Sequence, residues 1–149
     1  MIYPSVVQFI AIEAPAEAVL SYVAKVSIWP VWAITEIDSV RLCKDGHWEV
    51  QTPFGEGALK VHANAAVGTI DYHLLLRDQQ WIVPGRVVPN GDGCIFSLLL
   101  MKHPDVKYQD FQTQVASIER ELARLKALFE IPQVAESSVH HALSPWPSL

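Results

Sequence analysis

The sequence predicts an α+β domain in which a meander of antiparallel strands packs against a long C-terminal helix. From residue 36 to residue 101, apolar residues recur with period two in short segments separated by turn sequences. Consecutive short strands joined by tight turns form an antiparallel meander rather than βαβ units. Residues 105–130 instead show helical spacing of their apolar side chains. Together these patterns predict about seven strands, two short helices and one long helix.

The first part of the chain predicts a strand followed by two short helices. Residues 5–12, "SVVQFIAI", are rich in β-branched residues and form the expected first strand. Residues 14–26 predict a helix, with Pro15 suited to its first turn. Residues 27–32, "SIWPVW", predict a second short helix that Ser27 would cap.

Six further strands are expected in the meander. Turn sequences such as "KDG" at 44–46 and "NGDG" at 90–93 separate the alternating segments. The expected strands span residues 36–43, 46–52, 57–66, 69–76, 80–89 and 93–101.

The last element is a helix from about residue 105 to residue 130. Asp105 is the expected N-cap, and Pro132 ends the helix. Alternating spacings of three and four place one continuous apolar stripe on this helix: Tyr108, Phe111, Val115, Ile118, Leu122, Leu125 and Phe129. A coiled coil has similar spacing, but the polar and small residues scattered around the stripe favour a helix that lies across a sheet.

Length and composition indicate one globular domain over residues 1–132, followed by a flexible tail with several Ser and Pro residues at 133–149. A chain of 149 residues is long enough to bury roughly two-thirds of its unfolded surface. The net charge of −5 and a pI near 5.6 argue against a nucleic-acid partner.

No apolar run reaches the ~18 residues of a membrane span. The N-terminus lacks the pattern of a signal peptide, so a cytoplasmic location is expected. Cys43 and Cys94 are isolated in sequence, which favours two buried free thiols over the alternative, a disulfide between them.

Three segments resemble the START-like superfamily, also called SRPBCC. They are "IEAPAEAVLSYVAKVSIWPVW" at 12–32, "RVVPNGDG" at 86–93 and "VASIERELARLKALFE" at 115–130. The superfamily includes polyketide cyclases/dehydratases, lipid-transfer START domains and proteins like the birch-pollen allergen. The resemblance implies a helix-grip fold, in which a curved antiparallel sheet wraps the C-terminal helix. It also implies a cavity between them that holds a hydrophobic small molecule.

The resemblance therefore predicts a protein similar to the polyketide cyclases/dehydratases that binds a hydrophobic or aromatic small molecule, with catalysis left open. No cofactor is expected. A non-catalytic protein-interaction module, of the chaperone-cofactor or toxin type, is the alternative within the same superfamily. A homodimer is compatible with either function, but nothing in the sequence identifies its interface.

Polar side chains gather on one face of the hairpin formed by the expected strands 57–66 and 69–76. A two-residue loop at Val67 and Gly68 would set Asn64 opposite Asp71 and His62 opposite His73. Three interpretations follow. In the first, this face is the wet outer face, and Ile70, Tyr72 and Leu74 line the cavity. In the second, it points inward, and Asp71 orients His73 as a general acid or base. In the third, His62, Asp71 and His73 bind a metal ion.

Other candidate site residues are Arg86 and a set of aromatic side chains. Arg86 would anchor a carboxylate or enolate of the ligand, or serve as an edge charge against aggregation. The candidate aromatic ligand contacts are Trp29, Trp32, Phe54, Tyr72, Trp81 and Phe96. The short second helix lies at the cavity rim in the superfamily, which favours Trp29 and Trp32. The absence of GxSxG, P-loop and GxGxxG motifs argues against nucleophilic hydrolases and nucleotide enzymes.

Overall fold

The computed structural model describes residues 1–32, 37, 39–52 and 55–131. It contains one antiparallel sheet and one long helix, as the sequence predicts. The elements in chain order are β1 (Ser5–Ile12), α1 (Ala16–Val23), the 3₁₀ turn η1 (Val26–Ile28), α2 (Trp29–Trp32), β2 (Ser39–Leu42), β3 (Trp48–Thr52), β4 (Gly55–Asn64), β5 (Thr69–Leu76), β6 (Gln79–Asn90), β7 (Gly93–Met101) and α3 (Tyr108–Glu130).

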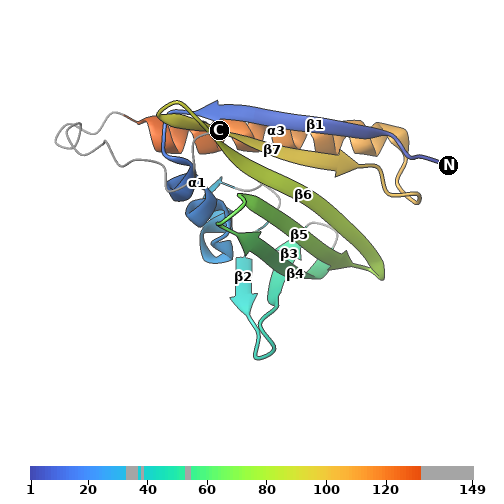
Figure 1. Ribbon diagram of the computed structural model, residues 1–149. Helices are drawn as coiled ribbons and strands as arrows, with labels where there is room; N and C mark the ends of the chain where they lie inside the picture. Colours follow the sequence, from blue (N-terminus) through green and yellow to red (C-terminus); the bar gives the residue numbers. More distant parts are fainter. Residues whose placement is uncertain (33–36, 38, 53–54, 132–149) are drawn as a thin grey trace.

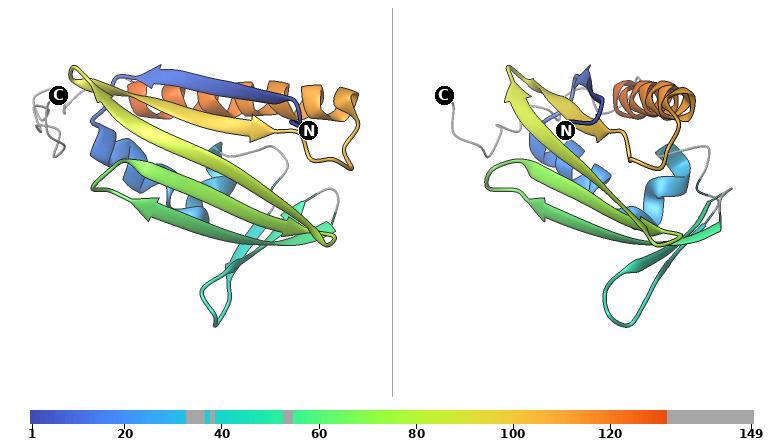
Figure 2. Two further views of the ribbon diagram at one scale, coloured as in Figure 1. Left: turned by 45° about the vertical axis from the view of Figure 1, so that its right-hand side comes forward. Right: turned by 90° about the vertical axis from the view of Figure 1, so that its right-hand side faces the viewer.

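The seven strands form one sheet in the order β1-β7-β6-β5-β4-β3-β2, and every neighbouring pair is antiparallel. The sheet curves strongly, and α3 lies along β1 and β7 on its concave side (Figure 1). Figure 2 shows α1 and α2 inside the curve, between α3 and the strands β4 and β5. The predicted α+β class with a helix-grip arrangement is confirmed.

Strict alternation of burial explains why the strands were recognisable in the sequence. In β7, the buried side chains are those of Cys94, Phe96, Leu98 and Leu100, and the residues between them are partly exposed. A strand that is buried on one face and wet on the other has this period of two. The stripe of α3 covers the same face of the sheet, with Phe111, Leu122 and Leu125 fully inside.

The starts of the helices differ from the expected ones because the expected capping residues do not cap them. α3 begins at Tyr108, and the residue before it, Lys107, makes no side-chain cap, so Asp105 is not the N-cap. Lys25, not Ser27, precedes η1. α3 ends at Glu130 and Ile131 is extended, as expected for a residue that precedes proline.

The register of the β4–β5 hairpin was predicted wrongly by two residues. Asn64 pairs with Thr69, which leaves a four-residue loop at 65–68. The Asn64 side chain accepts a hydrogen bond from the Ala66 amide (3.0 Å), and its carbonyl accepts one from Gly68 N (2.9 Å). Asparagine closes turns in this way, and Gly68 supplies the positive φ of 73°. Because the shift is even, every side chain stays on its predicted face.

No helix in the described part of the chain is long and apolar enough to cross a membrane. Phe54 and the tail at 133–149 lie outside the described residues, and the division between domain and tail stays a prediction.

Candidate functional site

The concave face of the sheet carries the apolar side chains of β5 and β6. Ile70 and Tyr72 of β5 are buried, at 0% and 6% exposure. Tyr72 pairs across the strands with Val83, and Leu74 pairs with Trp81. These side chains therefore face α3 and form the wall expected for a ligand cavity.

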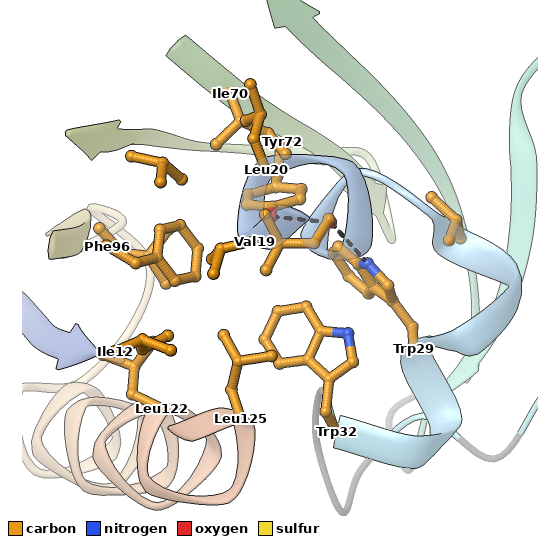
Figure 3. Close-up of a cluster of buried hydrophobic side chains, with 14 of the residues drawn as sticks. Ile12, Val19, Leu20, Trp29, Trp32, Ile70, Tyr72, Phe96, Leu122 and Leu125 are labelled. Atoms are coloured by element: carbon orange, nitrogen blue, oxygen red, sulfur yellow. Dashed lines mark hydrogen bonds between the residues drawn. The ribbon is translucent and has the colours of Figure 1, made fainter. Parts of the chain in front are cut away.

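Three aromatic side chains meet inside the curve of the sheet. Trp29 packs edge-on against Trp32, with ring centroids 5.9 Å apart, and edge-on against Tyr72, at 4.9 Å (Figure 3). Trp29 Nε1 (3.3 Å) and the Tyr72 hydroxyl (3.0 Å) both donate hydrogen bonds to the carbonyl oxygen of Val23. The cluster therefore joins α1, α2 and β5.

The hydroxyl of Tyr72 stays protonated in this environment. Burial raises the pKa of Tyr72 well above its usual value, and the negative charge of Glu121 raises it further. Tyr72 is therefore a hydrogen-bond donor at neutral pH rather than a base.

The long helix presents two polar side chains to the interior. Ser117 and Glu121 are each only 5% exposed, although they lie among the apolar residues of α3. They are four residues apart, so they sit one above the other on the same side of the helix. A buried carboxyl next to a buried hydroxyl is unusual unless it serves the fold or a ligand.

Several buried polar atoms have no hydrogen-bond partner among the described residues. They are Nε1 of Trp32, Nε1 of Trp81 and the hydroxyl oxygen of Ser117. The three atoms come from α2, β6 and α3, the elements that surround the interior. Leaving a buried donor without a partner costs about 1–3 kcal/mol. Three such groups around one interior are therefore unusual in a natural protein.

Trp81 contacts the segment between β7 and α3. Its ring stacks on His103, with centroids 5.2 Å apart and an interplanar angle of 28°. The residue as a whole is half-buried, whereas its Nε1 atom is fully buried. The stacking fixes the indole, and the N–H group is directed away from solvent.

The polar residues of β5 occupy the opposite, outer face. Asp71 and His73 alternate with buried Ile70 and Tyr72, and both are partly exposed. His62 lies opposite Asp71, not opposite His73 as predicted, but its ring still contacts that of His73 at 4.8 Å. This placement matches the first interpretation of the hairpin and is the opposite of the one that the acid–base interpretation requires.

Arg86 and the predicted metal alternative also lie on the outer face. Arg86 is exposed and pairs across the strands with Thr69 and Ser97, so its side chain points away from α3. Among the residues that the structure describes, His62, Asp71 and His73 do not bring three metal ligands together.

The predicted aromatic ligand contacts are mostly core residues. Phe96 is fully buried, and Trp29 and Trp32 are 7% and 3% exposed. Their contact with a ligand stays a prediction, as does that of Tyr72 and Trp81.

Two surface hollows of the described part of the chain lie outside this interior. One, of about 330 Å³, lies between β1 and α3 beside Val6, Phe111 and Val115. The other, of about 210 Å³, lies at the turn between β6 and β7. Neither is lined by Tyr72 or Trp81, so a cavity between the sheet and α3 stays a prediction.

Ser117 and Glu121 were not among the residues singled out in the sequence. The helical wheel places Glu121 about 40° beyond Leu125, just outside the edge of the apolar stripe, so the stripe alone does not predict that Glu121 is buried. The buried face of α3 is therefore wider than its apolar stripe and includes Ser117 and Glu121.

Comparisons with known proteins find matches among solved structures only. No protein-family model matches the sequence, and no curated protein matches it. A START superfamily protein from Mycobacterium smegmatis matches in structure with a TM-score of 0.66 and 20% identity, over 85% of this chain and 97% of its own. The Aha1 dimer from Colwellia psychrerythraea matches with a TM-score of 0.63 and 12% identity, over 86% of this chain and 97% of its own.

DynU16, a protein from the dynemicin biosynthetic locus, also matches, with a TM-score of 0.63 and 13% identity. The match covers 85% of this chain and 47% of DynU16. The chain therefore has the START-like helix-grip fold that its sequence resembles. At these identities the likeness establishes the fold alone.

Proposed function

We propose that this protein binds a hydrophobic or aromatic small molecule between the concave face of the sheet and α3. One observation carries the proposal: Nε1 of Trp32, Nε1 of Trp81 and the hydroxyl of Ser117 are buried in a largely apolar interior and have no hydrogen-bond partner among the described residues. A ligand with an apolar body and a few oxygen acceptors would satisfy these groups while its body contacts side chains such as Leu74 and Val83.

The chemistry of these groups narrows the ligand further. Indole N–H groups only donate hydrogen bonds, and the Ser117 hydroxyl donates or accepts. Carbonyl, ether or phenol oxygens on an aromatic or polyketide-like body would match them. Catalysis is not part of the proposal, because Asp71 and His73 lie on the outer face.

Native mass spectrometry of the purified protein tests the proposal first. A retained organic molecule of a few hundred daltons, released on denaturation, is the expected result. The probe 1-anilinonaphthalene-8-sulfonate, an aromatic and largely apolar anion, then tests where binding occurs. Ser117→Leu fills the interior and should weaken probe binding at least ~10-fold, the effect of ~1.4 kcal/mol.

Ser97→Leu is the matched control, since Ser97 lies on the outer face of β7. It should bind the probe like the unmodified protein. Trp81→Phe keeps an aromatic ring but removes the N–H group, and it covers the case in which Ser117→Leu fails to fold. Equal binding by all variants, with no retained molecule, would contradict the proposal.

A homodimer is a second possibility that one feature favours. β1 is an edge strand, and Val7 and Phe9 on its outer face are 59% and 67% exposed. Exposed edge strands with apolar side chains pair readily with other strands. Sedimentation velocity of the unmodified protein and of Phe9→Asp tests this: a dimer that dissociates in the variant supports it, and a monomeric unmodified protein refutes it.

A further inference from the structure

We propose that the β2–β3 hairpin binds a divalent transition-metal ion of the zinc class through Cys43, His47 and Glu49. One ligand atom from each of these residues lies within 4.8 Å of the other two. In a tetrahedral zinc site, ligand atoms lie roughly 3.3–3.8 Å apart, so shifts of about 1 Å would bring these three ligands into place, with water as the fourth ligand. The proposal is independent of the ligand-binding function, because the hairpin face concerned lies outside the interior.

The hairpin turn brings two of the ligands together. Cys43 N donates to the His47 carbonyl (2.9 Å), and Gly46 N donates to the Cys43 carbonyl (3.0 Å). Gly46 has a φ of +90°, which favours glycine and makes this tight turn possible. Cys43 and His47 are therefore direct neighbours across the hairpin.

The strand period supplies the third ligand. Glu49 is two residues after His47 and pairs with Arg41, which is two residues before Cys43. Positions two apart in a strand share a face, so all four side chains lie on one side of the hairpin. Val50, between Glu49 and Gln51, is fully buried, so that side is the outer one.

The ligand atoms determine the class of metal. A thiolate, an imidazole and a carboxylate together suit zinc or cobalt, whereas magnesium and calcium prefer oxygen ligands alone. The carboxylate of Asp45 pairs with Nδ1 of His47 and also accepts a hydrogen bond from the His47 amide (3.3 Å). This contact fixes the ring and leaves Nε2 for the metal, as a supporting carboxylate does in many zinc sites.

Existing contacts of Cys43 and Glu49 must give way when a metal binds, among them the hydrogen bond from the Cys43 thiol to the Arg41 carbonyl oxygen (3.9 Å). The Arg41 guanidinium pairs with Glu49, but the Arg41 side chain is 70% exposed and free to swing into solvent. The Cys43 thiol also forms a hydrogen bond with Glu49. Burial raises the pKa of the thiol most, and this hydrogen bond raises it further. Metal binding would therefore release the thiol proton to solvent as the thiolate–metal bond forms.

Cobalt titration under a non-thiol reductant tests the proposal. His140 and His141 are adjacent histidines elsewhere in the chain, so the full-length His140→Gln/His141→Gln protein is the background for every variant. Added Co²⁺ should produce the near-ultraviolet thiolate-to-cobalt charge-transfer band, saturating at one equivalent. Cys43→Ser should abolish the band, and His47→Gln should weaken cobalt binding at least ~10-fold.

Cys94→Ala is the matched cysteine control, since Cys94 is buried in β7. It should keep the band. Arg41→Gln tests the same site through an increase in affinity. It frees Glu49 from its ion pair and should tighten cobalt binding several-fold. This test remains available if Cys43→Ser is unstable. No band at saturating cobalt, a band that survives Cys43→Ser, or an unchanged affinity in Arg41→Gln would overturn the proposal.

Discussion

At the scale of single residues, the Val23 carbonyl oxygen accepts two hydrogen bonds and so links α1 to α2 and β5. Val23 is the last residue of α1, where helix carbonyls lack partners within the helix. Trp29 and Tyr72 both donate to this one oxygen. Either donor alone leaves the carbonyl satisfied, and the loss of both leaves it buried without a partner.

This arrangement predicts a non-additive pair of substitutions. Tyr72→Phe should lower the free energy of unfolding by about 0.5–1.5 kcal/mol, the usual net value of one hydrogen bond. Trp29→Phe should lower it through its own lost hydrogen bond and lost contacts. The double variant should lose more than the sum of the two, because only then is the Val23 oxygen orphaned. Urea denaturation of all four proteins measures the difference, and strictly additive values would contradict it.

The residue-scale predictions from sequence succeeded where period two decided them. The inward orientation of Ile70, Tyr72 and Leu74 follows from strand alternation alone and is confirmed. Which of the two faces would be wet was not determined by alternation, and the outer placement of Asp71 and His73 depends on where α3 packs. Contacts between distant elements, such as that of Trp81 with His103, require the tertiary structure.

At the scale of elements, the strands were predictable, but the ends of β2, β3, β4 and β6 differ from the expected ones. β1 and β7 have the expected bounds, because alternation is unbroken in both. The β4–β5 loop was misjudged because Asn64 closes the turn with its own side chain, which hydrophobic pattern does not report. The start of α3 was misjudged for a similar reason, since Asp105 does not cap it.

The C-terminal end of α3 is tied to the end of β1 by a charged pair. Glu130 Oε2 accepts hydrogen bonds from the Glu13 amide (3.0 Å) and from Lys126 Nζ (2.6 Å). Lys126 Nζ also donates to the Ala11 carbonyl (2.8 Å). The hydrogen bond from Lys126, followed by that from Glu13, lowers the pKa of Glu130 below its model-compound value of 4.5.

A lowered carboxyl pKa gives a stabilisation that is present above the unfolded pKa and lost as pH falls. Glu130→Gln should therefore reduce stability near neutral pH, and its difference from the unmodified protein should shrink as pH falls below 4.5. Urea denaturation over a pH series measures this. Glu119→Gln, at an exposed position of the same helix, is the control. A difference that stays constant with pH would contradict the assignment.

The junction between β1 and β7 depends on the absence of a side chain at Gly93. A Cβ added there would lie 2.5 Å from the Ile12 carbonyl oxygen, closer than real Cβ contacts allow. Gly93→Ala should therefore force a backbone shift and cost about 1–3 kcal/mol. Gly91→Ala is the control: it meets open space, and its φ of +58° alone costs about 1–2 kcal/mol. A loss of less than about 1 kcal/mol in Gly93→Ala, measured by urea denaturation, would contradict the close approach.

At the scale of the whole molecule, the helix-grip arrangement separates two surfaces with different chemistry. The concave side gathers apolar side chains and a few buried polar atoms, and the outer side carries the ionisable residues of β2–β5. The proposed ligand and the proposed metal therefore occupy opposite faces of one sheet, so substitutions at one should leave the other unaffected.

The prediction at the scale of the whole molecule concerns the boundary between the domain and the tail at 133–149. Every buried side chain of the core that the structure describes lies between Ile12 and Leu125. Since the described residues already form a continuous core, a chain ending at residue 132 should keep its thermal midpoint to within about 1 °C, less than the ~2–4 °C that 1 kcal/mol produces at this size. It should also bind 1-anilinonaphthalene-8-sulfonate as the full chain does. Thermal unfolding followed by circular dichroism and a probe titration measure both properties. A midpoint lower by several degrees, or altered probe binding, would show that the tail packs against the domain and belongs to its structural unit.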